Sequence, residues 1–395
     1  MKKILTLFLA VTLTFMSLNV SAFSKNDSKY AADSSFASID YSGLELDPEI
    51  RSAYLIEAGT GDVLYAKNEF KSASPASVTK IMTLLLVAEA LKDGRFDLDT
   101  IVSVSSHAAS MGGSQVFLEE GERISVRDLI KSTVIASAND AAVALAELTA
   151  GSESAFVKKM NERASELGLT NTSFENTTGL DDTTTNHYSC AADIGKMSRE
   201  LIKHDIILEY SSIWQDTIRN GEFTLTNTNR LVRYYDGCNG LKTGSTDKAG
   251  YCVSATAKRG NMQLIAVIMG APSRDARNEA ARELLDYGFA NFAVYESGES
   301  FIESIPVLSG VKDFVPTHSS PFTAVVNKSK LSSVEQIYDI PETLTAPISE
   351  GQVVGRIVYK LDGEQLGYSD IYAADSVDEI TFFDILIRLL KRMVE

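Results

Sequence analysis

Two short segments near residue 60 alternate apolar and polar residues. They read SAYLIEA (52–58) and DVLYAKN (62–68), and a Gly-Thr-Gly turn separates them. Alternation on both sides of a glycine turn predicts a β-hairpin. A run of apolar residues follows between Pro75 and Gly94, and this arrangement predicts a helix that starts at the proline and stops at the glycine.

Between about residues 97 and 235 apolar residues recur every three or four positions, which predicts a mostly helical region. Ser125 and Asp128 stand where a capping box would begin one of these helices. Gly151 and Gly168 stand where two others would end. The helices expected here cover residues 125–136, 140–151 and 155–168.

Strand-like segments return between residues 240 and 270. GLKTG, YCVSATA and MQLIAVIMG follow one another with short polar turns, which predicts an antiparallel meander, and residues 273–289 have the spacing of a closing helix. Because strands precede and follow the helical middle, we expect one sheet that contains both ends of this region and is covered by helices. The fold class expected is therefore α+β.

The pattern changes again after about residue 295. Residues 298–375 are strand-like and interrupted by prolines, which predicts a small all-β domain. Residues 376–395 are amphipathic, with Arg388, Lys391 and Arg392 gathered near the end, and this is typical of a helix that lies in a membrane interface. A helix docked on the β domain, or a dimer contact, would show the same pattern. The apolar face is formed by Ile380, Phe383, Ile387, Leu390 and Val394.

The N-terminus has the features of an export signal. Met1-Lys2-Lys3 is positively charged, residues 4–20 are largely apolar, and Val20-Ser21-Ala22 has small residues where a signal peptidase would cut. We expect a signal peptide over 1–22, although a retained transmembrane anchor has a similar pattern. Residues 23–45 lack periodicity and are expected to be a linker. The mature chain is therefore expected on the extracytoplasmic side of the membrane.

Charge and cysteine content exclude several classes of protein. The formal net charge of −16 over 395 residues argues against nucleic-acid binding, which requires a basic surface. Three cysteines allow at most one disulfide, and Cys238 with Cys252 is the pair to test. The four histidines have no metal-binding spacing, so neither a metal nor another cofactor is expected.

The segment SPASVTKIMT (74–83) is the first candidate for chemistry. It places Lys80 three residues after Ser77, on the same helix face, at the head of a strongly apolar run. A serine hydroxyl needs a base to act as a nucleophile, and a desolvated lysine near another cation can lose its proton and serve as that base. A helix N-terminus also offers a backbone N–H to a developing oxyanion. Ser-x-x-Lys alone is a weak signal, because it also occurs in ordinary helix starts.

Two further motifs strengthen the signal. Ser137-Ala138-Asn139 lies between two predicted helices, and Lys242-Thr243-Gly244 opens the strand meander. The set Ser-x-x-Lys, Ser-x-Asn and Lys-Thr-Gly, in this order, is similar to that of penicillin-binding proteins and class A β-lactamases. From about residue 46 onward the chain resembles the serine-type D-alanyl-D-alanine carboxypeptidases, which are low-molecular-mass penicillin-binding proteins. The resemblance extends to GGSQVFLEEGE (112–122), MNERASELGLTNTSFENTTGL (160–180) and LKTGSTDKAGYC (241–252).

This resemblance implies a β-lactamase/transpeptidase-like catalytic domain over 46–293, with its active site between a helical subdomain and the sheet. It also implies cleavage of the terminal D-Ala from peptidoglycan stem pentapeptides, and covalent inhibition by β-lactams. An endopeptidase, a β-lactamase and a non-catalytic cell-wall-binding protein are the alternatives. Ala138 and the absence of a Glu-x-x-Leu-Asn motif disfavour a class A β-lactamase.

The resemblance also assigns roles to individual residues. Ser77 is the implied nucleophile, Lys80 its general base, and Ser137 the proton relay to the leaving group. Asn139 is expected to hold the substrate amide and to position Lys80. The implied substrate-binding residues are Lys242, Thr243, Gly244, Ser245 and Arg277, with Arg274 as the alternative arginine. The backbone N–H of Ser245 is the implied second oxyanion donor, beside that of Ser77.

Overall fold

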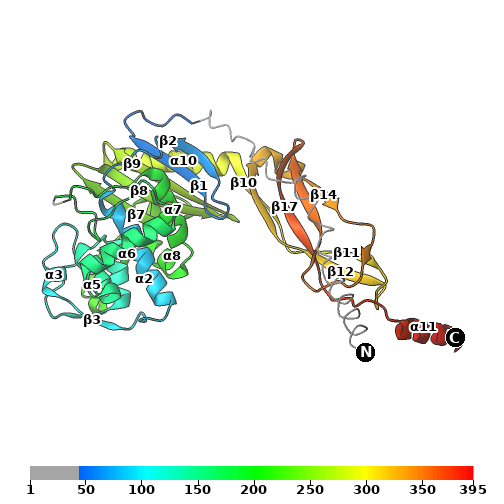
Figure 1. Ribbon diagram of the computed structural model, residues 1–395. Coiled ribbons are helices and arrows are strands. Elements are labelled where there is room, and N and C mark those ends of the chain that lie inside the picture. Colours follow the sequence, from blue (N-terminus) through cyan, green and yellow to red (C-terminus); the bar gives the residue numbers. More distant parts are fainter. Residues whose placement is uncertain (1–43, 183, 395) are drawn as a thin grey trace, which may run out of the picture.

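The computed structural model describes residues 44–182 and 184–394 (Figure 1). The expected signal peptide, and the expected linker apart from its last two residues, lie outside the described residues. The fold class is α+β, as expected. The chain forms two units, each with its own β-sheet, and a short helix follows the second unit at the C-terminal end.

The first unit is built on a five-stranded sheet with the order β2-β1-β9-β8-β7, in which every neighbouring pair is antiparallel. The sheet therefore combines the expected N-terminal hairpin with the expected meander from much later in the chain, and both predictions are confirmed. The strands are β1 (Ser52–Glu57), β2 (Val63–Lys67), β7 (Cys238–Thr246), β8 (Gly250–Arg259) and β9 (Met262–Ala271).

Both faces of this sheet are buried, because alternate residues of the same strand enter different cores. On β1, Tyr54 and Ile56 pack with the helical middle of the chain, whereas Leu55 packs with α10 (Arg274–Asn291). Figure 1 shows α10 on one face of the sheet and the helices labelled α2 and α5 to α8 on the other.

The helices on that other face begin and end close to where the sequence predicts. Ser125 caps α4 through a 3.1 Å hydrogen bond from the Asp128 backbone N–H, and Gly151 ends α5 with a left-handed φ of 83°. The helices are α2 (Lys80–Lys92), α3 (Ser106–Ala109), α4 (Val126–Ile135), α5 (Asn139–Ala150), α6 (Glu153–Glu166), α7 (Ala191–Leu201) and α8 (Asp205–Ser211). A further short helix, α9 (Leu231–Tyr234), contributes Leu231 to the core under α10.

Two short hairpins interrupt the region that the sequence predicts to be mostly helical. Their strands have only three or four residues, which is too short for a clear alternation of apolar and polar positions. The first hairpin pairs β3 (Ile101–Ser103) with β4 (Arg123–Ser125), and the second pairs β5 (Gln215–Ile218) with β6 (Phe223–Thr226) around the 3₁₀ turn η2 (Arg219–Gly221).

The three cysteines are free thiols, so the pairing of Cys238 with Cys252 does not occur. Cys252 lies opposite Gly244 in the β7–β8 ladder, and Gly244 is six residues along β7 from Cys238. At about 3.3 Å per residue this separates the two cysteines by roughly 20 Å, whereas a disulfide requires Cα atoms within about 7 Å.

The second unit is the expected all-β region, with a six-stranded sheet in the order β14-β16-β17-β12-β11-β15. It has its own apolar core, which includes Val315, Val354 and Tyr359. Its strands are β11 (Phe301–Leu308), β12 (Phe314–Ser319), β14 (Glu335–Asp339), β15 (Leu344–Thr345), β16 (Val353–Leu361) and β17 (Glu364–Ala373), and η3 (Lys328–Ser333) is a 3₁₀ helix between them.

Strand β10 (Phe292–Ser297) joins the two units. It follows α10 directly in sequence and pairs with β13 (Phe322–Asn327). Phe292 and Val294 belong to the core under α10, whereas Tyr295 packs against the core of the second unit. The connection is therefore a paired strand with side chains in both cores.

The last helix, α11 (Phe382–Val394), begins six residues later than the expected segment 376–395. Val377 precedes it, is fully buried, and forms an isolated bridge with Ile348. Arg388 holds α11 to the second unit by donating hydrogen bonds to the backbone oxygens of Gly310 and Val311. Figure 1 shows α11 at the end of the second unit that is remote from the first sheet.

Candidate active site

Ser77 lies in a 3₁₀ turn, η1 (Ala76–Thr79), and not in the α-helix that the sequence predicts from Pro75. The α-helix begins at Lys80, three residues later. Side chains three residues apart nearly eclipse in a 3₁₀ turn, and the Lys80 Nζ atom accordingly lies 3.0 Å from the Ser77 Oγ atom. The expected pair is therefore in contact, through a tighter turn than expected.

The Lys80 side chain is completely buried and has three oxygen partners. Besides the Ser77 hydroxyl, the Nζ atom lies 2.6 Å from Asn139 Oδ1 and 2.8 Å from the Thr178 backbone oxygen. A neutral amine has two N–H groups and one lone pair. It can donate to the two carbonyl-type oxygens, which only accept, and direct its lone pair at the Ser77 hydroxyl proton.

Electrostatics favours this neutral form. Burial lowers the pKa of Lys80 well below its usual value of 10.5, and the nearby Lys242 ammonium lowers it further, while Asp140 acts in the opposite direction. The amine at the head of this apolar helix is therefore buried beside a hydroxyl and loses its proton more readily than a lysine in water does.

The second motif is held at the junction of α4 and α5. Ser137 has a left-handed φ of 64°, which is unusual for a residue with a side chain, and it is buried. Asn139 is the first residue of α5, and its amide is shared between two partners. Its Oδ1 atom accepts from Lys80, and its Nδ2 atom donates to the Gly112 backbone oxygen at 2.7 Å.

The third motif comes from β7, on the opposite side of the site. The Lys242 Nζ atom lies 2.8 Å from the Ser137 Oγ atom and 2.9 Å from the backbone oxygen of Thr243. Burial lowers the pKa of Lys242 to about 7, with a further contribution from Arg277. The Thr243 hydroxyl donates to the Thr228 hydroxyl at 2.8 Å. Three distant parts of the chain therefore form two hydrogen-bonded groups. One contains Ser77, Lys80 and Asn139, and the other contains Ser137 and Lys242.

Gly244 lets β7 approach the Ser77 turn closely. A Cβ atom at this position would lie 2.7 Å from the Ser77 backbone nitrogen and 2.9 Å from that of Val78. Ser245, the next residue, is exposed and lines the same cleft. The close approach brings the end of β7 next to the backbone nitrogens of Ser77 and Val78. The resemblance predicts that the oxyanion donors, the N–H groups of Ser77 and Ser245, lie here.

A loop that the sequence analysis did not assign to the site supports the turn from the other side. The Asp181 Oδ2 atom accepts hydrogen bonds from the Ser74 hydroxyl at 3.0 Å and from the Thr246 hydroxyl at 2.6 Å, which ties the turn to the end of β7. A Cβ atom on Gly179 would lie 1.8 Å from the Ala76 backbone oxygen. The sequence NTTGL (176–180), which belongs to a segment that resembles the family, is the sequence signal for this loop.

His187 is a second residue that sequence reasoning missed. It is buried beneath the turn, its Nδ1 atom accepts from the Glu175 backbone N–H at 3.0 Å, and its Nε2 atom lies 2.8 Å from the Thr79 hydroxyl. Since Nδ1 accepts, the proton is on Nε2. Burial lowers the pKa of His187 to about 4, so the ring is neutral and acts as a support for the helix start.

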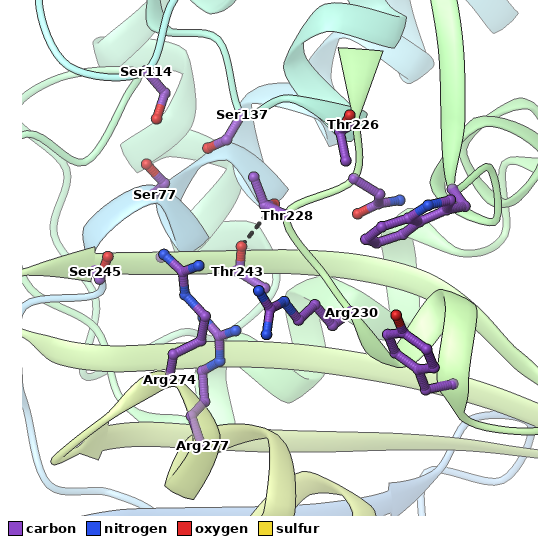
Figure 2. A pocket seen from close by; sticks show the side chains of 14 residues that line it. Ser77, Ser114, Ser137, Thr226, Thr228, Arg230, Thr243, Ser245, Arg274 and Arg277 are labelled. Carbon is purple, nitrogen blue, oxygen red and sulfur yellow. Dashed lines mark hydrogen bonds between the residues drawn. The ribbon is translucent and has the colours of Figure 1, made fainter.

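Ser77 and Ser137 border a cleft of about 520 Å³ (Figure 2), which Thr243, Gly244 and Ser245 line from β7. Arg274 and Arg277, the two arginines considered from the sequence, both line it from the start of α10, and Arg230 lines it as well. Arg277 is almost fully buried, and burial together with the Arg274 charge lowers its pKa to about 10. No group of three His, Cys, Asp or Glu side chains suited to a metal ion is present within residues 44–182 and 184–394.

The fold and the site together define a class of proteins, the active-site serine enzymes that include penicillin-binding proteins and serine β-lactamases. Within this class, residues 43–273 match the family model for D-alanyl-D-alanine carboxypeptidases, and the chain belongs to this family. Residues 289–379 match the model for the C-terminal domain of penicillin-binding protein 5. The predicted family is thereby confirmed.

Known relatives match most of the chain. It is 40% identical over 398 residues to D-alanyl-D-alanine carboxypeptidase DacF of Bacillus subtilis (strain 168). This alignment covers 99% of this chain and 98% of the relative. It is 34% identical over 347 residues to DacC of Escherichia coli (strain K12), covering 85% and 86% of the two chains.

Solved structures agree with this assignment. Penicillin-binding protein 5 from Haemophilus influenzae matches with a TM-score of 0.74 at 32% identity, covering 85% of this chain and 99% of that one. Penicillin-binding protein D2 from Listeria monocytogenes, in its ampicillin-bound form, matches with a TM-score of 0.58 at 32% identity, covering 62% of this chain and 100% of that one.

Proposed function

We propose that Ser77 is the acylated nucleophile of this chain and Lys80 its general base. The chain is a D-Ala-D-Ala carboxypeptidase of the penicillin-binding type. One observation carries the assignment of residues: the buried Lys80 amine contacts the Ser77 hydroxyl, while two acceptor oxygens occupy its remaining positions. This arrangement leaves a lone pair for the hydroxyl proton and no other task for the amine.

Acylation then proceeds by attack of the Ser77 Oγ atom on the carbonyl carbon of the penultimate D-Ala. Lys80 takes the hydroxyl proton, and the backbone N–H groups of Ser77 and Ser245 stabilise the oxyanion. The bond from carbon to the leaving nitrogen breaks as Ser137 relays to that nitrogen the proton that Lys80 has taken, which leaves Lys80 neutral again. D-Ala leaves, and an ester to Ser77 remains.

The other residues bind and orient the substrate. Thr243 and Arg277 bind the carboxylate of the terminal D-Ala, and the Lys242 ammonium adds positive charge beside Ser137. Asn139 holds the Lys80 amine and the substrate amide. Water later attacks the ester and regenerates Ser77. β-Lactams acylate the same serine and leave slowly, because the opened ring blocks the approach of water.

Labelling with a fluorescent penicillin tests the serine assignment. The wild-type chain should be labelled and should release D-Ala from a pentapeptide, and penicillin should block this release. Ser77→Ala should abolish both the label and the release. Ser114→Ala, which removes another hydroxyl that lines the cleft, is the matched control and should retain the label. Labelling of Ser77→Ala would contradict the assignment.

We also propose that α11 attaches the enzyme to a membrane surface. Its large apolar side chains are exposed, from 41% for Leu386 to 82% for Met393, although a water-soluble helix would cover such residues. None of the described helices is long and apolar enough to cross a bilayer. The eight exposed apolar residues are Phe382, Phe383, Ile385, Leu386, Ile387, Leu389, Leu390 and Met393.

Location follows from the substrate. Peptidoglycan lies outside the cytoplasmic membrane, so the enzyme acts on the extracytoplasmic side, in agreement with its family. Removal of residues 1–22 after Ala22 remains a prediction, and N-terminal sequencing of the mature protein would test it.

A further inference from the structure

The cleft contains more positive charge than one substrate carboxylate requires. Three arginines, Arg230, Arg274 and Arg277, line it, together with hydroxyl, amide and aromatic side chains, and no described Asp or Glu is among its lining residues. This concentration of cations occurs in a chain whose net charge is −16. Figure 2 shows the three arginine side chains on one side of Thr243, with Ser77 and Ser137 on the other.

None of the three arginines is neutralised by a carboxylate. Arg277 donates from Nε and Nη2 to the side-chain oxygen of Asn278, at 3.1 Å and 2.9 Å, and this partner is uncharged. Within the part of the chain that the structure describes, neither Arg230 nor Arg274 forms a side-chain hydrogen bond or an ion pair, whereas Arg282, two turns further along α10, pairs with Glu279 at 2.8 Å.

Unpaired cations that lie close together repel one another. Arg274 and Arg230 both act to lower the pKa of the buried Arg277, and Arg277 in turn lowers that of Lys242. Bound anions relieve this repulsion. The terminal carboxylate of a D-Ala-D-Ala substrate supplies one negative charge, to be held by Thr243 and Arg277. Arg230 and Arg274 then still face the cleft without an anion.

We infer that Arg230 and Arg274 form a second anion subsite, which accepts a carboxylate on the side chain of the residue that the enzyme releases. This inference rests on the proposed function, because the proposed contact of the terminal carboxylate with Arg277 puts the released residue beside all three arginines. Tyr234 and Trp214 line the same cleft, whose volume of about 520 Å³ is larger than an alanine side chain needs. The substrate class is a peptide that ends in an acidic D-amino acid.

The chemistry is the same as for D-Ala. The carbon–nitrogen bond to the released residue breaks, the Ser77 ester forms, and the nitrogen receives its proton through Ser137. The added contact is a guanidinium–carboxylate pair, which can be bidentate and is stronger than a neutral hydrogen bond. Because the pair is present before and during acylation, its effect should appear mainly in KM.

A matched pair of substrates tests the subsite. Two peptides with the same acyl half and the C-terminal residues D-Glu or D-Gln differ in side-chain charge and hardly in shape. For the wild-type enzyme we expect kcat/KM to be on the order of 10-fold higher for D-Glu release than for D-Gln release. The double variant Arg230→Gln/Arg274→Gln should bring this ratio close to 1. High salt should reduce the ratio in the wild-type enzyme.

Controls separate this inference from the proposed function. Arg282→Gln removes an ion-paired arginine of the same helix and should leave the ratio unchanged. A ratio near 1 in the wild-type enzyme, or one that survives in the double variant, would overturn the subsite even if D-Ala release and penicillin labelling are normal. If Ser77→Ala is labelled by penicillin, the proposed function fails irrespective of the ratio. Thermal unfolding of each variant verifies that it is folded.

Discussion

At the scale of single residues, two buried lysines have different surroundings and therefore different protonation. Lys80 faces two acceptor oxygens and a hydroxyl, with Lys242 nearby, and these surroundings favour its neutral form. Lys242 contacts the Ser137 hydroxyl and a backbone oxygen, and its pKa is about 7. One residue type thus provides a base in one place and a cation that titrates near neutrality in the other.

The pH dependence of the enzyme should report on Lys242. Its proposed role requires the charged form, which is present below the pKa and is lost as the pH rises through about 7. The pH profile of kcat/KM reflects the free enzyme, so its alkaline limb should fall in this range. Arg277→Gln removes the neighbouring charge that lowers the pKa of Lys242, and should therefore move the alkaline limb to higher pH.

The position of the limb, not the absolute rate, is the measurement. Arg277→Gln also weakens binding of the substrate carboxylate, so kcat/KM falls at every pH. Arg282→Gln is again the control, since its ion pair lies outside the cleft, and its limb should match that of the wild-type enzyme. An alkaline limb that stays in place in Arg277→Gln would contradict the coupling between Arg277 and Lys242.

At the scale of elements, the site depends on how closely β7 approaches the start of α2. Gly244→Ala would place a Cβ atom 2.7 Å from the Ser77 backbone nitrogen and 2.9 Å from that of Val78. Neither nitrogen can move away unless the whole turn η1 shifts. We expect β7 to shift away from Ser77 and the rate of penicillin acylation to fall on the order of 10²-fold, since misplacement by about 1 Å can cost that much.

Gly298→Ala is the matched control for this substitution, because a Cβ atom there meets nothing within 4 Å. Its acylation rate should equal that of the wild-type chain. Stopped-flow measurement of acylation, together with unfolding in urea, distinguishes a misplaced strand from a destabilised fold. A normal acylation rate in Gly244→Ala would mean that the close approach is unimportant.

The sequence predicts the elements of the first unit well, because its strands and helices have strong periodicity and recognisable ends. Ser125, for example, begins α4 and Gly151 ends α5 where expected. It mispredicts the turn at Ser77, since α- and 3₁₀-helical starts share their sequence signals. It misses Asp181 and His187, because both act through partners more than 60 residues away, which no local pattern encodes.

At the scale of the whole molecule, the sequence predicts two units and a terminal helix but not how they are joined. The continuous α10–β10 connection follows from the pairing of β10 with β13, 30 residues later. Val377 shows why the start of the terminal helix is mispredicted. It lies within the segment 376–395 that the sequence predicts to be an amphipathic helix, but in the structure it forms a bridge with Ile348. Long-range pairing overrides a local pattern here.

Truncation tests the proposed role of α11. A chain that ends at Thr381 keeps the buried Val377 and loses the exposed apolar helix. If each of the eight exposed side chains contributes even about 1 kcal/mol, the full-length chain binds lipid vesicles firmly and the truncated chain does not. Flotation with vesicles measures this, and D-Ala release from a soluble peptide should be unchanged. A truncated chain that still floats would contradict the proposal.

The direct passage from α10 into β10 has a consequence for the place of action if α11 attaches the enzyme to a membrane, as proposed. No residue separates α10 from β10, and β10 is paired with β13, whereas the exposed segment 298–300 lies between β10 and β11. If α11 lies on a bilayer, the second unit acts as a spacer between that bilayer and the cleft. An enzyme attached through α11 would trim stem peptides only within a thin layer of the wall, at a height set by the length of that spacer. Lengthening or shortening the second unit would move this layer without touching a single catalytic group.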